Sequence, residues 1–257
     1  MTKQLEIENA DGVRRIIFRR EEAFNAISEE MAVGLVQQLY DASADESIRV
    51  VVIAGSGMAF SAGADLTGDD PIQNFDERTM EGAATIIRAI TVCDKPVVAA
   101  VNGVAAGVGA SICFAADLAI AQRSAAFLLA FSQVGLMPDG GSSLTVAASV
   151  GRAKAMRMAL LAETVSAQEA YDAGLVSHLV ADEDFETTVA KVARRLAAGP
   201  PIAFAATKRA INAATIGGLE DALDREGRGQ VLLFGTEDAA EGMRAFVQKR
   251  RPTFTGR

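Results

Sequence analysis

The stretch KPVVAAVNGVAAGVGASICFAADLAIA, residues 95–121, decides the fold of this chain. It predicts a buried strand over Val97–Val101, a turn at Asn102-Gly103, a packed helix over Ala110–Ala116 and then a second strand. A short apolar run rich in β-branched residues is typical of a strand that is covered on both faces. Strand, turn, helix and strand in this order indicate an α/β architecture.

Two glycines, Gly107 and Gly109, flank Val108 where the predicted turn enters the helix. A turn of this kind directs free backbone N–H groups out of a helix N-terminus, where they stabilise a developing negative charge. Glycines between a strand and a helix also serve plain close packing, and the stretch alone leaves both interpretations open. Neither a Rossmann spacing nor the Gly-Lys-Ser/Thr ending of a P-loop is present.

Composition excludes several classes of protein. The 257 residues are half hydrophobic and carry a net charge of −8, with no dense Lys/Arg stretch and no Trp, which argues against a nucleic-acid-binding protein. Cys93 and Cys113 lie in apolar context and are predicted to be reduced core thiols. The N-terminal residues lack a secretory apolar segment, and no apolar run reaches the ~20 residues that span a bilayer. We therefore expect a cytoplasmic protein that does not act on membranes.

Strand and helix patterns alternate over the first two thirds of the chain, and the last third is almost entirely helical. The predicted strands are Leu5–Glu8 and Val13–Arg19 around an Asp11-Gly12 turn, Arg49–Ala54, Ala125–Phe131 and Val176–Val180; the predicted helices start after Ser28 and cover about 76–92, 152–162, 185–198, 202–214 and 219–233. We predict one α/β core over residues 1–198 and a helical C-terminal region over 199–257.

Two further segments are candidates for a site. FSAGADLTGDD, from Phe60 to Asp70, is a predicted loop of small residues that would let a flat ligand lie against the backbone, although the segment by itself favours a plain βα connection. Asp139 stands between Pro138 and Gly140-Gly141 at the head of an apolar helix. Its carboxylate suits either an N-cap or acid–base chemistry.

Most side-chain chemistry is excluded by composition. His178 is the only histidine and lies in a strand-like apolar segment, so we expect it to be structural and expect no metal site. No Gly-x-Ser-x-Gly sequence marks a serine nucleophile. Acid–base catalysis by a carboxylate, assisted by backbone N–H donors, remains.

Four motifs together resemble the crotonase superfamily, the enoyl-CoA hydratases and isomerases. They are FSAGADL at 60–66, KPVVAAVNGVAAGVGASICFAAD at 95–117, VGLMPDGGSS at 134–143 and the tail GTEDAAEGMRAFVQKRRPTF, and they cover nearly the whole chain in the family's order. The resemblance implies a crotonase-like spiral of ββα units, a helical C-terminal trimerisation region, and homotrimers that pair into hexamers. It implies an acyl-CoA thioester as substrate, with no separate cofactor.

The resemblance also implies site residues. The backbone N–H groups of Ala64 and Val108 would hold the thioester oxygen, and the CoA arm would lie along the segment that contains Ala62, Ala64, Asp65 and Leu66. Phe246 and Lys249 have the spacing of a Phe and a Lys that reach the CoA of a neighbouring subunit in this family. Lys249 would meet a CoA phosphate.

The chain departs from the hydratase pattern at both catalytic glutamates, because Ser111 and Phe131 stand at those positions. Asp139 matches an aspartate found in a subset of the family that includes isomerases. We therefore predict a double-bond isomerase with Asp139 as acid–base, since one carboxylate suffices to move a proton between carbons. The alternatives are a hydratase that uses Asp139 and water, and a non-catalytic acyl-CoA-binding protein. The acyl chain is not specified; Phe75, Met80, Ile86, Phe131 and Met137 are candidates for an apolar pocket or for core.

Overall fold

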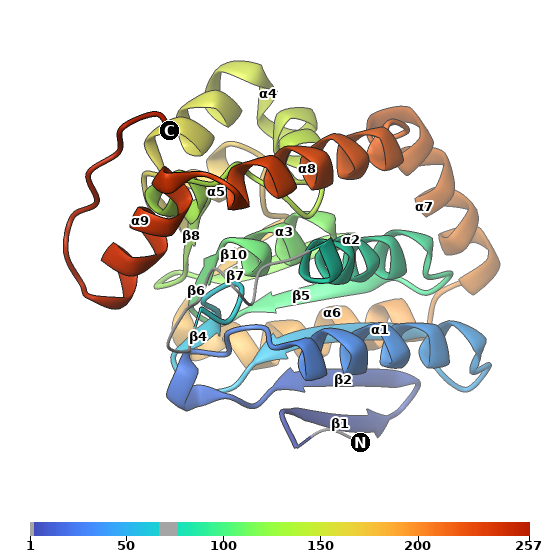
Figure 1. Ribbon diagram of the computed structural model, residues 1–257. Coiled ribbons are helices and arrows are strands. Elements are labelled where there is room, and N and C mark those ends of the chain that lie inside the picture. Colours follow the sequence, from blue (N-terminus) through green and yellow to red (C-terminus); the bar gives the residue numbers. More distant parts are fainter. Residues whose placement is uncertain (1–2, 67–76) are drawn as a thin grey trace.

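The computed structural model describes residues 3–66 and 77–257, and its strands form two sheets (Figure 1). The six-stranded sheet has the order β1-β2-β3-β5-β7-β10, with β1 Leu5–Ala10, β2 Val13–Phe18, β3 Val50–Gly55, β5 Val97–Val101, β7 Leu118–Gln122 and β10 His178–Val180. The four-stranded sheet has the order β4-β6-β8-β9, with β4 Ala59–Ser61, β6 Val104–Ala106, β8 Ala126–Leu128 and β9 Val165–Ser166.

A repeated ββα unit generates both sheets. The units are β3-β4-α2, β5-β6-α3 and β7-β8-α4, with α2 Glu77–Val92, α3 Val108–Ala115 and α4 Ser142–Leu161. Each unit gives its first strand to the large sheet, its second strand to the small sheet, and then a helix. Successive units pair in parallel, so the chain winds as a spiral. The predicted spiral of ββα units is confirmed.

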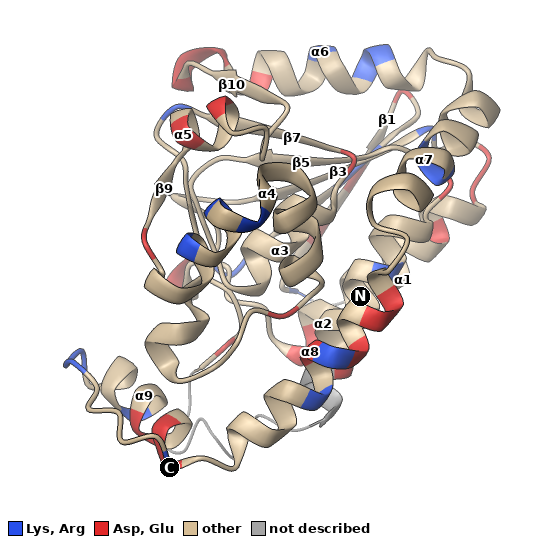
Figure 2. Ribbon diagram, turned by 90° about the horizontal axis from the view of Figure 1, so that it is seen from above, with Lys and Arg blue, Asp and Glu red and all other residues tan. Residues whose placement is uncertain are grey.

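The central strands of the large sheet are buried on both faces, as their unbroken apolar runs predict. On β3, Val51 and Ile53 join the main core under α1 (Glu29–Ala44), α2 and α3. Val50 and Val52 pack on the other face, against α6 (Phe185–Ala197). In Figure 2 helices α1 and α6 carry charged residues, whereas α3 carries none. Each face of the large sheet therefore has its own helical cover.

Local signals placed several elements correctly. Asp11 and Gly12 both have positive φ and close the β1–β2 hairpin. The Ser28 hydroxyl accepts from Met31 N at 3.2 Å and caps α1. These are the roles expected of such residues in a tight hairpin and at a helix start.

Two short strands of the small sheet, β4 and β6, were missed, and β8 is shorter than predicted. The loop predicted over Phe60–Asp70 begins inside β4, and the glycine-rich turn after β5 contains β6. The strand predicted over Ala125–Phe131 ends at Leu128 and is followed by the 3₁₀ turn Ala130–Val134. Three-residue strands are too short to show an alternating pattern, which explains these errors.

The C-terminal helices fold back over the core (Figure 1). They are α7 Pro201–Thr215, α8 Leu219–Phe234 and α9 Glu237–Val247; α5 (Ala167–Asp172) precedes them. Buried Lys208 on α7 bonds to Asp117 at 2.9 Å, while α8 packs on α2 and α4, and α9 packs on the 3₁₀ turn. The division at residue 198 and the trimerisation role remain predictions.

Candidate active site

Two hollows flank the large sheet. The first, here named the α1–α2 pocket, has a volume of about 860 Å³ and is lined by α1, α2, the segment after β4, the start of α3, the turn that holds Asp139, and Phe246. The second, here named the α6 groove, has about 780 Å³ and is lined by β1, β2, the segments after β3 and β5, and the start of α6. They lie on opposite faces of the large sheet.

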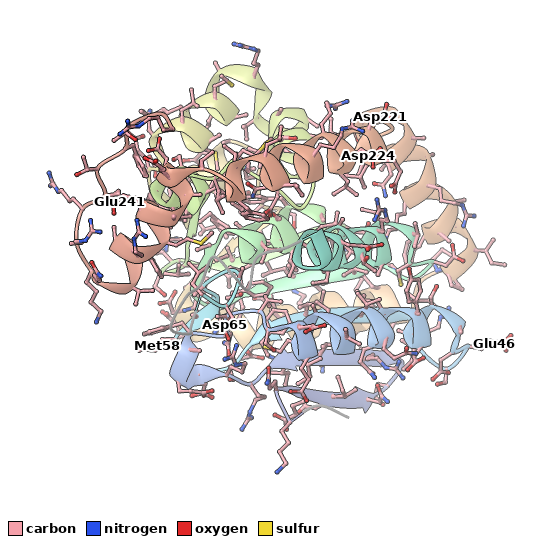
Figure 3. The ribbon with its side chains drawn as sticks, in the orientation of Figure 1. Glu46, Met58, Asp65, Asp221, Asp224 and Glu241 are labelled. Carbon is pink, nitrogen blue, oxygen red and sulfur yellow. The ribbon has the colours of Figure 1, made fainter. Side chains whose placement is uncertain are left out.

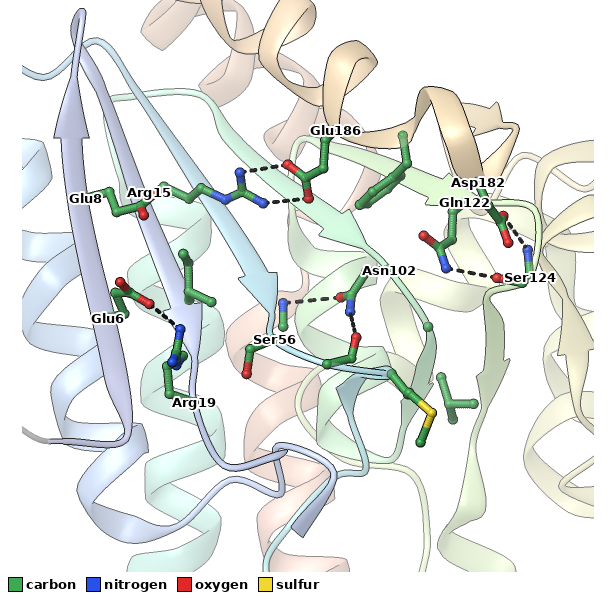
Figure 4. A pocket seen from close by; sticks show the side chains of 17 residues that line it. Glu6, Glu8, Arg15, Arg19, Ser56, Asn102, Gln122, Ser124, Asp182 and Glu186 are labelled. Atoms are coloured by element: carbon green, nitrogen blue, oxygen red, sulfur yellow. Dashed lines mark hydrogen bonds and ion pairs between the residues drawn. The ribbon is translucent and has the colours of Figure 1, made fainter. Parts of the chain in front are cut away.

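The α6 groove is polar, and most of its charges pair with one another (Figure 4). Arg15 bonds to both carboxylate oxygens of Glu186 at 2.8 Å, and Arg19 bonds to Glu6 at 2.6 Å. Asp182 accepts from the backbone N–H of Ser124 at 3.0 Å. Groups that satisfy one another in this way hold elements together and leave little for a ligand.

In the α1–α2 pocket, two backbone segments meet through glycines. β4 and β6 are parallel neighbours, so the segments after them lie at the same edge of the small sheet. A Cβ added to Gly63, which has φ +101°, would lie 2.9 Å from the Ala106 carbonyl oxygen, and one added to Gly109 would lie 2.7 Å from the Ser61 carbonyl oxygen. Only glycine permits this approach without displacement of the backbone.

Ala64 directly follows Gly63, Val108 directly precedes Gly109, and both residues line the pocket. The first bond within α3 runs from Ser111 N to Gly107 O at 3.1 Å, so Val108 N–H precedes the helical ladder. Outside the regular helices and strands, no backbone hydrogen bond between described residues uses Ala64 N or Val108 N as donor. Ala64 and Val108 thus line one pocket, and the role of their N–H groups as donors to a thioester oxygen remains a prediction.

Asp139 lies in a tight turn that is stabilised by hydrogen bonds to its own backbone carbonyl. Ser111 Oγ and Ser142 Oγ donate to that carbonyl at 2.9 and 2.7 Å. Gly140 and Gly141 follow with φ +60° and +73°, a left-handed pair that L side chains rarely adopt. The turn therefore fixes where the Asp139 side chain leaves the backbone.

The alternative that Asp139 is only an N-cap is wrong. The N-cap residue of α4 is Gly141, without a side-chain cap. The carboxylate that meets the start of α4 belongs to Glu226 on α8, which accepts from Gly141 N at 2.7 Å and from Ser143 N at 3.0 Å. The Asp139 carboxylate therefore does not cap α4.

Burial raises the pKa of Asp139 to about 7; a hydrogen bond from Gln230 lowers this pKa in part, and the charge of Glu226 raises it. Only 7% of the residue is exposed. Gln230 Nε2 donates to Oδ2 at 2.9 Å, whereas Oδ1 is buried without a hydrogen-bond partner among the described residues. A carboxyl group in this state is present in both protonation forms near neutral pH.

The two hydratase positions are occupied by groups that cannot move a proton. Ser111 is fully buried, and its hydroxyl donates to Asp139 O and lies 3.3 Å from Gly107 O. Phe131 lines the pocket, and its ring lies 3.9 Å from where a Cβ on Gly107 would be.

The predicted CoA-binding residues fall into two groups. Ala62, Asp65 and Leu66 line the pocket together with Ala64, and Asp65 is held by Arg20 at 2.7 Å. Phe246 also lines the pocket, on α9 of the same chain. Lys249 is exposed two residues beyond α9 and is not among the described lining residues. A role of Phe246 and Lys249 toward a neighbouring subunit remains a prediction.

The residues predicted to form an apolar pocket or core differ in where they lie. Ile86 lines the pocket, whereas Met137 packs against α8 at Gly229. Phe75 and the side chain of Met80 lie outside the described residues. Cys93 and Cys113 are free and buried, as predicted.

His178 lies on β10 with Nδ1 2.9 Å from Ser177 Oγ. Within the described ranges, no group of His, Cys, Asp and Glu is arranged to hold a metal ion. None of the helices there combines the length and apolar character needed to cross a bilayer.

Sequence analysis missed Glu226 and Gln230, which are 1% and 0% exposed on α8. The signal was available: they continue the apolar face formed by Leu219, Ala222 and Leu223, with helical spacing. Polar side chains on the buried face of a helix require partners, and here the partners are the turn that holds Asp139.

The chain is similar to known proteins over nearly its whole length, and these similarities identify its family. The enoyl-CoA hydratase/isomerase family model matches residues 8–257. A probable enoyl-CoA hydratase of Rhodobacter capsulatus is 42% identical, covering 97% of both chains, and the 1,2-epoxyphenylacetyl-CoA isomerase of Escherichia coli is 37% identical, covering 96% of both. The crystal structure of an enoyl-CoA hydratase from Mycobacterium avium subsp. paratuberculosis superposes with a TM-score of 0.93 at 42% identity, covering 99% of this chain and 100% of that one. The names of such relatives include hydratases, isomerases and dehalogenases.

Proposed function

The chain belongs to the enoyl-CoA hydratase/isomerase family, and from that premise we propose that it moves the double bond of an unsaturated acyl-CoA thioester, with Asp139 as the acid–base. The observation that supports this most is the buried Asp139 carboxyl group, whose Oδ1 has no partner among the described residues, in the pocket that Ala64 and Val108 also line. A non-catalytic acyl-CoA-binding role does not account for that carboxyl group.

In the proposed reaction, the thioester oxygen accepts from the N–H groups of Ala64 and Val108. Removal of a proton from carbon then forms an enolate, whose negative oxygen these fixed donors stabilise. Loss of one donor of this kind costs on the order of 3 kcal/mol. The close contacts of Gly63 and Gly109 hold the two donors in place before the substrate arrives.

Asp139 takes the proton from one carbon and becomes a neutral acid. The electron pair moves through the conjugated system, and Asp139 returns the proton to another carbon, so no atom is gained or lost. A pKa of about 7 suits both halves of the cycle, because neither protonation form is strongly favoured at neutral pH.

Hydration is the second candidate, and the name of the Rhodobacter capsulatus relative supports it. It requires a water to be activated while a carbon is protonated. With Ser111 and Phe131 at the glutamate positions, Asp139 is the only carboxyl group left at a family catalytic position. A single carboxyl group serves isomerisation more directly than hydration.

Binding of the CoA moiety is proposed for the segment Ala62–Leu66 and for Phe246, with Lys249 at a phosphate. Arg250 contributes less than its charge suggests, because Glu241 (Figure 3) already accepts from its guanidinium at 2.8 Å. We keep a homotrimer or a dimer of trimers as the proposed assembly.

A panel of 2-enoyl- and 3-enoyl-CoA thioesters, followed by ultraviolet absorbance and mass spectrometry, tests the reaction. We expect the conjugated enoyl band to change with no change in mass. A gain of one water in the product would establish the hydratase alternative, and unchanged substrate across the panel would leave only binding.

A further inference from the structure

Gln230 on α8 contacts the Asp139 carboxylate, although it belongs to none of the four family motifs. Gln230 is fully buried, and its side chain bridges two residues of the turn. Its Oε1 accepts from Met137 N at 3.3 Å, and its Nε2 donates to Met137 O at 2.9 Å and to Asp139 Oδ2 at 2.9 Å.

The orientation of the Gln230 amide is fixed by its partners. A backbone N–H is always a donor, so the Gln230 atom facing Met137 N must be the oxygen. The amide nitrogen then faces two acceptors, one for each of its hydrogens: the Met137 carbonyl and Asp139 Oδ2. The opposite orientation would place two donors face to face.

This contact makes the two Asp139 oxygens unequal. Oδ2 accepts an N–H whether or not the carboxyl group is protonated, so a proton on Asp139 is placed on Oδ1. Oδ1 is the oxygen without a partner among the described residues. We propose that Gln230 is a positioning residue that holds Oδ2, so that Oδ1 is the atom that removes the proton from the substrate and returns it. This inference rests on the proposed isomerase function.

Glu226, one helical turn before Gln230, acts on the same carboxyl group in the opposite direction. It is bonded to the start of α4 and sits close enough for its charge to disfavour ionisation of Asp139. Ser111 on α3 and Ile87 on α2 also face the turn, and neither side chain carries a charge. Among the described residues, the charge of Glu226 raises the pKa of Asp139, and the hydrogen bond from the neutral Gln230 lowers it.

The test is the titration of Asp139 itself, followed by NMR of protein labelled with ¹³C at the aspartate carboxyl carbons, with the signal assigned by its loss in Asp139→Asn. In Gln230→Met, loss of the donor should raise the titration midpoint by about one pH unit, the size of one hydrogen bond to a charged group. Glu226→Gln should lower the midpoint. An unchanged midpoint in Gln230→Met would overturn the assignment.

Gln230→Glu is the second variant if Gln230→Met does not fold, since it keeps an acceptor for Met137 N. When ionised, the new carboxylate cannot donate and adds a negative charge next to Oδ2, so the midpoint should rise further. A midpoint that stayed at its wild-type value would again overturn the assignment.

The pH dependence of turnover separates this inference from the proposed function. If both hold, the break in the pH–rate profile moves with the NMR midpoint in each variant. If the NMR midpoint moves and the rate profile does not, Gln230 positions Asp139 but Asp139 is not the acid–base.

Discussion

The α1–α2 pocket and the α6 groove have similar volumes, about 860 and 780 Å³, on opposite faces of one sheet. They differ in how their polar groups are partnered. In the groove, Arg15 Nε and Ser56 Oγ have no hydrogen-bond partner among the described residues, but the other guanidinium nitrogens of Arg15 already bond to Glu186. In the pocket, the Asp139 carboxyl group is buried, and the hydrogen bond that it accepts from a described side chain comes from the neutral Gln230. Volume alone therefore does not distinguish a catalytic candidate from another hollow, whereas a buried titratable group with a strongly shifted pKa does.

The largest expected difference between the two hollows follows from Asp139→Asn. We expect turnover to fall by about 100-fold or more, as for loss of a general acid–base, with acyl-CoA binding retained. The measurement is steady-state turnover together with CoA-ester affinity. The matched change in the groove is Asp182→Asn, for which turnover should stay within about twofold of wild type, since surface substitutions away from a site act weakly.

The same two variants should change stability in opposite directions. Burial raises the pKa of Asp139 from 3.8 to about 7, so its contribution to stability is lost as pH rises from about 4 to about 7. Asp139→Asn should therefore be more stable than wild type at pH 8 by at most roughly 4 kcal/mol, three pKa units at 1.36 kcal/mol each. The pKa of Asp182 is lowered by its hydrogen bonds to Ser124, so Asp182→Asn should lose stability at neutral pH. Urea unfolding at pH 5 and pH 8 measures both; a loss of stability in Asp139→Asn at pH 8 would contradict the account.

The oxyanion donors are tested by Gly109→Ala. The added Cβ would lie 2.7 Å from Ser61 O, so α3 must move away from β4 and carry Val108 N–H with it. We expect a loss in turnover of roughly 100-fold, the cost of one misplaced donor. Gly227→Ala is the control, because a Cβ there meets nothing within 4 Å on α8. Equal turnover in the two variants would remove the α3 N-terminus from the mechanism.

Phe246→Ala should weaken acyl-CoA binding without changing the chemical step. The ring lines the pocket although 58% of the residue is exposed, and an aromatic contact of this kind is worth about 1 kcal/mol, or roughly fivefold in affinity. Phe254, another exposed phenylalanine of the tail, provides the control variant Phe254→Ala. Isothermal titration with a CoA ester distinguishes the two; equal affinities would argue against Phe246 at the ligand.

The smallest effect is expected in the groove. Glu186→Gln breaks the ion pair with Arg15, whose side chain is 28% exposed, and such pairs contribute at most about 1 kcal/mol. Turnover and acyl-CoA affinity should be unchanged, while the melting temperature falls slightly. A loss of turnover comparable to that of Asp139→Asn would mean that the groove takes part in function.

The sequence allowed the spiral fold and the α1–α2 pocket to be predicted because their signals are local or carried by motifs. Buried strands show unbroken apolar runs, the Ser28 cap precedes its helix, and four motifs carry the family. Ala64, Val108 and Asp139, from three separate motifs, do line one pocket. The short strands β4 and β6 could not be predicted, because three residues are too few to show the alternating pattern of a strand.

The remainder of the site depends on contacts between residues far apart in sequence. Gln230 meets Asp139 across 91 positions, and Glu226 meets Gly141 across 85. Their spacing on α8 shows that they face the core, but not which turn they contact. The protonation state of Asp139 could therefore be inferred only from the structure, because its burial and its hydrogen-bond partners set its pKa.

The pH dependence of kcat/KM for an enoyl-CoA substrate, measured from about pH 5 to pH 9 in wild type and in Asp139→Asn, tests the central claim most directly. The account predicts a wild-type rate that is half-maximal near pH 7, the raised pKa of Asp139, and that falls with decreasing pH as the base is protonated. It also predicts that the residual rate of Asp139→Asn lacks this break. A wild-type rate independent of pH over this range, or the same break retained in Asp139→Asn, would contradict the account.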